Sequence, residues 1–98
     1  MEPLLNTAAN GHLMISFEER DSRAWLVARN YLELELGFQR GGQLVIGAGE
    51  GIRPSFSRGH IDISAGWDIW SGDYLLATCP AGDDVLRKVF TFVIEAPS

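Results

Sequence analysis

The sequence predicts an α+β fold, in which a small antiparallel sheet is covered on one face by a helix near the C-terminus. We expect about five to seven short strands in a meander-like order. Three observations support this fold class. Apolar and polar residues alternate in several short segments, glycine-containing turns separate these segments, and the apolar spacing changes to three and four residues near the end of the chain. The length of 98 residues predicts one domain, 1–98.

Alternation is clearest in residues 32–38. Four apolar residues occupy every second position: Leu32, Leu34, Leu36 and Phe38. Glu33 and Glu35 stand between them. Because successive side chains of a strand point to opposite faces, this pattern predicts a strand with Leu34 and Leu36 in the core and both glutamates exposed.

The segments before this strand are less regular. Residues 1–11 contain proline, asparagine and glycine and are predicted to form a loose N-terminal arm. Alternation over 13–17 predicts a strand, and the charged run 18–23 predicts an exposed loop. Residues 24–29 allow two interpretations. Trp25 and Val27 favour a strand, which we predict, whereas Asp21 or Ser22 could cap a helix.

Turn residues mark the elements of the second half. Gly41-Gly42 predicts a hairpin leading into a strand at 43–46, and the glycine-rich segment 47–59 predicts a flexible connection. Alternation over 60–64 predicts the next strand. Residues 67–70 and 73–77 flank the compact turn Ser71-Gly72, which predicts a hairpin.

The C-terminal segment has the apolar spacing of a helix. Val85, Leu86 and Val89 recur at three- and four-residue intervals and are predicted to pack on the sheet, with Arg87 and Lys88 facing water. We expect the helix to begin near Asp83, since acidic residues favour a helix N-terminus. The β-prone run 90–94 leaves open a helix that stops near residue 90 and is followed by a last strand.

Charge and composition exclude several classes of function. Thirteen acidic and eight basic residues give a formal net charge of −5, which argues against binding to nucleic acid or to an anionic membrane surface. The same charge suits solubility and docking to a basic protein. The only cysteine, Cys79, reads as a small buried side chain. No signal peptide or membrane-spanning run is recognisable, so we expect a cytoplasmic protein.

No motif predicts a catalytic, metal or cofactor site. The glycines of 47–51 have the wrong spacing for a dinucleotide-binding turn, and no two of His12, His60 and Cys79 lie close in sequence, as zinc ligands would. His60 and Asp62 share the polar face of a predicted strand. With Arg53 they form an alternative ligand-binding or catalytic group in the region 47–62.

The hairpin 67–74 is the strongest candidate for a functional site. Large aromatic residues occupy both of its faces, so a sheet covered on one side buries only some of them. Aromatic anchors among charged residues are typical of protein interfaces. The predicted partner-binding residues are Trp67, Asp68, Trp70, Asp73 and Tyr74, together with Glu33 and Glu35.

In size, charge and predicted strand content the chain resembles bacterial immunity proteins and phage-encoded inhibitors, which bind and neutralise another protein. The resemblance implies a non-catalytic protein-binding module, and the net charge suits a partner with a basic surface. Two alternatives remain open. One is a homo-oligomeric module such as a homodimer, and the other is a small-ligand binder or enzyme that uses the region 47–62.

Overall fold

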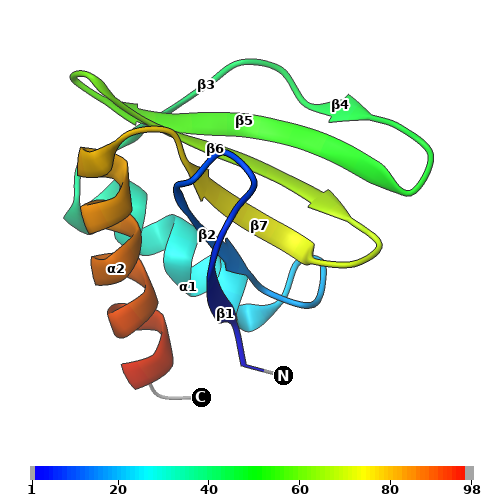
Figure 1. Ribbon diagram of the computed structural model, residues 1–98, viewed down its shortest axis with the longest axis horizontal. Coiled ribbons are helices and arrows are strands. Elements are labelled where there is room, and N and C mark those ends of the chain that lie inside the picture. The colour runs from blue at the N-terminus through cyan, green and yellow to red at the C-terminus, as the bar shows by residue number, and fades with distance from the viewer. Residues whose placement is uncertain (1, 97–98) are drawn as a thin grey trace.

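The fold is an antiparallel sheet with helices packed on one face, as predicted (Figure 1). The structure is a computed structural model and describes residues 2–96. The sheet has seven strands in the order β1-β2-β7-β6-β5-β3, with β4 also pairing with β5. The strands are β1 (Leu4–Thr7), β2 (Leu13–Ser16), β3 (Gln39–Gly41), β4 (Val45–Ile46), β5 (Glu50–Arg58), β6 (Ile61–Asp68) and β7 (Gly72–Ala77).

The longest strand, β5, occupies most of the segment for which we predicted a flexible connection, so that prediction was wrong. Glycines and Pro54 disfavour a regular strand. The register between β5 and β6 shifts between Arg53 and Phe56, so Pro54 lies at an irregularity that tolerates it. On its other side β5 pairs with two short strands, β4 at Gly51 and β3 further along.

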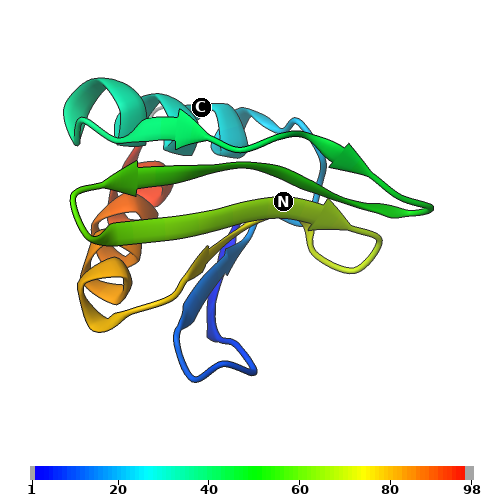
Figure 2. The same ribbon diagram turned by 90° about the horizontal axis from the view of Figure 1, so that it is seen from above.

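The sheet is twisted, and its two halves differ in direction. Figure 2 shows β1 and β2 running across the direction of β5 and β6, as accumulated right-handed twist produces. The core lies between the sheet and helices α1 (Arg23–Asn30) and α2 (Pro80–Glu95). Its buried apolar residues are Ile15, Phe17, Trp25, Ala28, Leu32, Phe38, Phe56, Ile63, Ala65, Leu75, Ala77, Val85, Leu86, Val89 and Val93.

Helix α1 replaces the strand that we predicted at 24–29. The Ser22 hydroxyl accepts a hydrogen bond from the Trp25 backbone N–H at 3.1 Å and so caps the helix. A π-helical turn, η1 (Tyr31–Glu35), continues the same direction. The buried residues Trp25, Ala28 and Leu32 are spaced as one face of a helix.

The strand predicted at 32–38 is therefore also wrong. Leu32 and Phe38 are buried, but Leu34 is 81% exposed and Leu36 is half-buried. Glu35 is exposed, while Glu33 is half-buried and lies 3.9 Å from Arg29 one helical turn earlier. The turn ends where the Leu36 N–H donates to the Tyr31 carbonyl and Gly37 adopts a positive φ of 73°.

Helix α2 confirms the prediction made from its apolar spacing. Val85, Leu86 and Val89 are buried, and Arg87 and Lys88 are exposed. The helix begins at Pro80, slightly earlier than predicted, with the Cys79 sulfur as N-cap acceptor. It continues to Glu95, so there is no strand after residue 90 in the described part of the chain.

The N-terminal segment is more ordered than the predicted loose arm, because Leu4–Thr7 pair with β2 as strand β1. The β1–β2 turn is fastened to the start of α2. Asp83 accepts hydrogen bonds from the Leu13 N–H at 2.8 Å and from His12 Nδ1 at 3.0 Å. Both hydrogen bonds hold the pKa of the Asp83 carboxyl below its usual value, and the bond from His12 has the larger effect.

Substituting neighbouring leucines tests the helical assignment of 31–35. Leu32→Ala is expected to destabilise the fold by about 2–5 kcal/mol, because it leaves a cavity in the core. Leu34→Ala removes an exposed side chain and is expected to change the free energy of unfolding by less than about 0.5 kcal/mol. Urea unfolding monitored by circular dichroism measures both. Equal losses would indicate an alternating strand instead.

The contact between His12 and Asp83 predicts a dependence of stability on pH. Since the folded-state pKa of Asp83 lies below its unfolded value of about 3.9, its stabilisation is complete above that value. The stabilisation is lost as the pH falls through the folded-state pKa. Asp83→Asn is therefore expected to lower the urea midpoint at neutral pH and to reduce its fall on acidification.

The neighbouring variant Asp84→Asn is the control for this experiment, because Asp84 is exposed and forms an exposed pair with Arg87 one turn later. Its urea midpoint should follow that of the wild type across the acid range. A wild-type acid response retained in Asp83→Asn would contradict the assignment.

Candidate functional site

A buried ion pair joins the two halves of the sheet. Arg53 Nε donates to Asp73 Oδ1 at 2.6 Å, and the Asp73 side chain is 0% exposed. Arg53 Nη2 also donates to Asp21 Oδ1 at 2.9 Å, while the Asp21 backbone N–H donates to Asp73 Oδ2 at 2.7 Å. Three separate parts of the chain thus meet at one carboxylate, and its charge is balanced by Arg53.

The loop 17–22 is held against the β6–β7 turn by this network. The Asp73 N–H donates to the Glu19 carbonyl at 3.0 Å, and the Glu18 N–H donates to the Ser71 carbonyl at 2.7 Å. Within the described chain, Glu18 and Asp21 are the non-glycine residues with positive φ, at 67° and 54°. Such conformations cost free energy and persist where the surroundings enforce them, often at functional sites.

Trp67 is buried beneath the same loop, with 4% of its surface exposed. The Arg20 guanidinium lies 4.4 Å from the centre of the indole ring, and that of Arg53 lies 5.0 Å away. Gly51 faces the ring across the strand pair, and a Cβ atom there would approach it to 2.2 Å. The Trp67 indole is therefore a buried side chain that packs against Gly51 and contacts two guanidinium groups.

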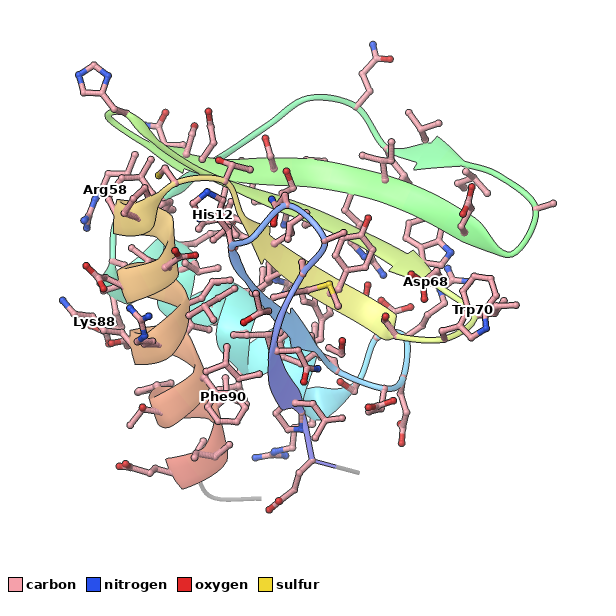
Figure 3. The ribbon with its side chains drawn as sticks, viewed as in Figure 1. His12, Arg58, Asp68, Trp70, Lys88 and Phe90 are labelled. Atoms are coloured by element: carbon pink, nitrogen blue, oxygen red, sulfur yellow. The ribbon has the colours of Figure 1, made fainter. Side chains whose placement is uncertain are left out.

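Trp70, three residues later, has the opposite environment and is 78% exposed. The carboxylate of Asp68 fixes its turn by accepting hydrogen bonds from the backbone N–H groups of Trp70 at 2.9 Å and Ser71 at 2.6 Å. Gly72 closes the turn with φ 64°, and a Cβ there would collide with the backbone of residues 18–19. Figure 3 shows Trp70 and Asp68 together, far from Lys88 on α2.

Further exposed apolar side chains lie at the same end of the sheet. We call this end the sheet tip, defined as residues 45–52 and 67–72 with the adjoining loop 18–21. In Figure 1 its two turns project beyond the helices. A Cβ atom on Gly49 would lie 3.2 Å from the Ile69 side chain, so the two turns are close together here. The exposed apolar residues of the tip are Val45, Ile46, Ile52, Ile69 and Trp70.

The outer face of the tip, which points away from the helices, is hollowed. A groove of about 320 Å³ there is lined by eight residues: Val45, Gly47, Glu50, Gly51, Ile52, Trp67, Asp68 and Tyr74. Burial raises the pKa of Tyr74, and the charges of Asp68 and Glu50 raise it further.

The residues predicted to bind a partner are thus only partly brought together. Trp67, Asp68 and Trp70 lie in the tip, and Asp73 and Tyr74 follow it directly on β7. Trp67 and Asp73 are buried, and Asp73 is paired with Arg53. Asp68 and Tyr74 are half-buried. Glu33 and Glu35 belong to η1, packed with α1 on the helical side, so they are not part of this surface.

The alternative ligand-binding group is not assembled. Arg53 points to the helical face, where it meets Asp73 and Trp25. Asp62 is exposed and alternates with the buried Ile63, which places it on the outer face. His60 lies in the turn between β5 and β6, remote from the tip. Within residues 2–96 no three potential metal-ligating side chains gather.

Sequence reasoning missed the contributions of Ile46, Ile52 and Ile69 to the tip. Ile46 ended a predicted strand and Ile52 lay within the segment predicted to be flexible, so the pairing of β4 with β5 that brings them to the tip was not recognised. Ile69 stands in the turn beyond β6, where the alternation of a strand no longer indicates which side chain is exposed. The pairing of Arg53 with Asp73 could not be predicted from a local sequence pattern, because 20 residues separate the two.

Comparisons with protein-family models, curated proteins and solved structures find no match to this chain. None of the helices formed by residues 2–96 has the length and hydrophobicity needed to span a bilayer.

Removing the Asp73 charge tests the role of the buried pair. Asp73→Asn leaves the Arg53 guanidinium without its main counter-charge and is expected to cost about 3–5 kcal/mol of stability. The matched control is Asp84→Asn, which breaks an exposed pair with Arg87 and should cost less than about 0.5 kcal/mol. Urea denaturation measures both variants. A loss in Asp73→Asn no larger than in the control would contradict this role.

Proposed function

We propose that the protein is a non-catalytic binding module that docks onto a partner protein through the sheet tip, as a small acidic inhibitor of the immunity type would. The observation that carries this proposal is the exposure of Trp70, which presents a full indole ring on a tightly bonded turn. Tryptophan is enriched among the residues that dominate interface affinity. Ile46 and Ile69, also in the tip, are exposed as well.

The charge around the tip supports a basic partner. Five acidic residues stand in the three segments of the tip, against one arginine. This arginine, Arg20, covers Trp67, and the adjoining Arg53 pairs with Asp73, so both cations are engaged within the protein. An apolar centre with an acidic surround is suited to a partner that presents apolar side chains among lysines and arginines.

The rigidity of the tip also favours binding. Asp68 bonds to its own turn, Gly72 packs against the loop 18–21, and the pair of Arg53 and Asp73 fixes that loop. A surface whose side chains are already held in place loses less conformational entropy when a partner docks. This arrangement distinguishes Trp70 from an exposed aromatic residue on an unstructured loop.

One observation favours a homo-oligomer as the second candidate. On the helical side a groove of about 330 Å³ is bordered by Val27, Tyr31, Leu34 and Phe92. Leu34 and Phe92 are exposed, and the Phe92 ring stacks on Tyr31 with 4.1 Å between centroids. A second copy of the chain is a suitable occupant, because Arg23 and Glu35 border the groove with opposite charges.

Substituting Trp70 tests the proposed binding surface. The immobilised full chain is used to capture proteins from its host lysate, and the affinity of a captured and purified partner is then measured by calorimetry. Trp70→Ala is expected to weaken this affinity by about 30-fold or more, because it removes the central aromatic anchor. Its stability should change by less than about 0.5 kcal/mol.

The control is Leu34→Ala, which removes an equally exposed apolar side chain from the helical side. It should keep wild-type affinity. Loss of affinity in Leu34→Ala with retention in Trp70→Ala would place the interface on the helical groove. A captured species of the same mass as this chain would favour the homo-oligomer.

A further inference from the structure

The groove on the outer face of the tip has a composition that selects one kind of side chain. Its walls are apolar and aromatic, from Val45, Ile52 and Tyr74, and two carboxylates, Glu50 and Asp68, lie along it. At about 320 Å³ it is at the lower end of the sizes found for ligand pockets. It suits one inserted side chain better than an extended ligand.

The two carboxylates of the groove face each other. Glu50 and Asp68 are directly opposed in the register of β5 and β6 and therefore point to the same face. Like charges in this position destabilise a sheet. Within the described chain neither carboxylate forms an ion pair, and Asp68 uses Oδ1 for its own turn. A cation brought by a partner would relieve this repulsion.

The apolar walls and the tyrosine favour arginine over lysine as that cation. A guanidinium is weakly hydrated, donates in a planar fork to carboxylates and stacks on aromatic rings. The protein uses this contact elsewhere, since Arg40 lies 4.2 Å from the Phe56 ring centre and Arg20 lies 4.4 Å from that of Trp67. A calcium ion is less suitable, because two carboxylates supply few of the oxygen ligands that it takes, and no third potential metal ligand gathers here among residues 2–96.

We propose that the groove between Val45, Ile52 and Tyr74 receives an arginine side chain of the partner protein, held by Glu50 and Asp68. This inference rests on the proposed function and specifies which partner residue enters beside the Trp70 turn. The arginine stacks on Tyr74, and its guanidinium donates to the two opposed carboxylates.

Short peptides test this inference without the partner. The full chain, labelled with ¹⁵N, is titrated with acetyl-Gly-Arg-Gly-amide and followed by NMR. Saturable shifts are expected at the backbone amides of Gly51 and Asp68. The neutral citrulline peptide, which has nearly the same shape, should produce none, and the lysine peptide should bind more weakly. Equal shifts from arginine and citrulline, or equal affinity for arginine and lysine, would overturn the proposal.

Variants locate the peptide site. Glu50→Gln is expected to weaken the affinity for the arginine peptide by up to about fivefold, the range for a partly exposed charge pair. Glu35→Gln removes the same charge far from the groove and should leave the affinity unchanged. Equal effects of the two variants would mean that the peptide is held only by long-range electrostatic attraction, and would overturn the proposed arginine site.

Trp70→Ala should not alter the peptide titration, because Trp70 does not border the groove. This result separates the two proposals. Absence of peptide binding would overturn the arginine site alone, since capture of a partner through Trp70 does not depend on it.

Discussion

The contact between Arg53 and Asp73 is the constraint on which the arrangement of the tip depends. It connects β5 to β7 across β6, and through Asp21 it reaches the loop that precedes α1. Burying an ion pair rarely stabilises a fold as much as apolar packing of the same volume. The ion pair acts here by fixing the conformation of the loop. The Asp73 carboxylate holds Asp21 at positive φ, and Glu18 is held by a hydrogen bond to the β6–β7 turn.

The different fates of Trp67 and Trp70 follow from this network. Arg53 and Arg20 both lie over the Trp67 indole, which faces the helices and becomes part of the buried layer. The chain then leaves β6, and the Asp68 carboxylate accepts hydrogen bonds from the backbone N–H groups of Trp70 and Ser71. Trp70 therefore stands in a turn, where it is largely exposed. Two tryptophans three residues apart thereby acquire separate roles, one in stability and one at the surface.

Sequence reasoning was most accurate where the residues that form an element also bury it. In α2 the spacing of Val85, Leu86 and Val89 indicates a helix, and the same three residues form the face that packs on the sheet. The alternation at 32–38 misled because Leu32 and Leu36 also have helical spacing, and the stripe that decides the structure begins at Trp25. The hairpin 67–74 could be predicted, but not which tryptophan is buried, because that depends on distant residues such as Arg53.

The helices and the sheet differ in extent, and this difference explains why an apolar surface remains at the tip. Helix α2 packs on β2, β6 and β7, whereas β4 and the start of β5 extend past it (Figure 1). Ile46 and Ile52 on this overhang contribute little to the core, so folding does not require them to be apolar. Soluble proteins seldom cluster exposed apolar side chains without a binding role. In the function that we propose, the acidic residues around the overhang keep it hydrated until a partner of opposite charge covers it.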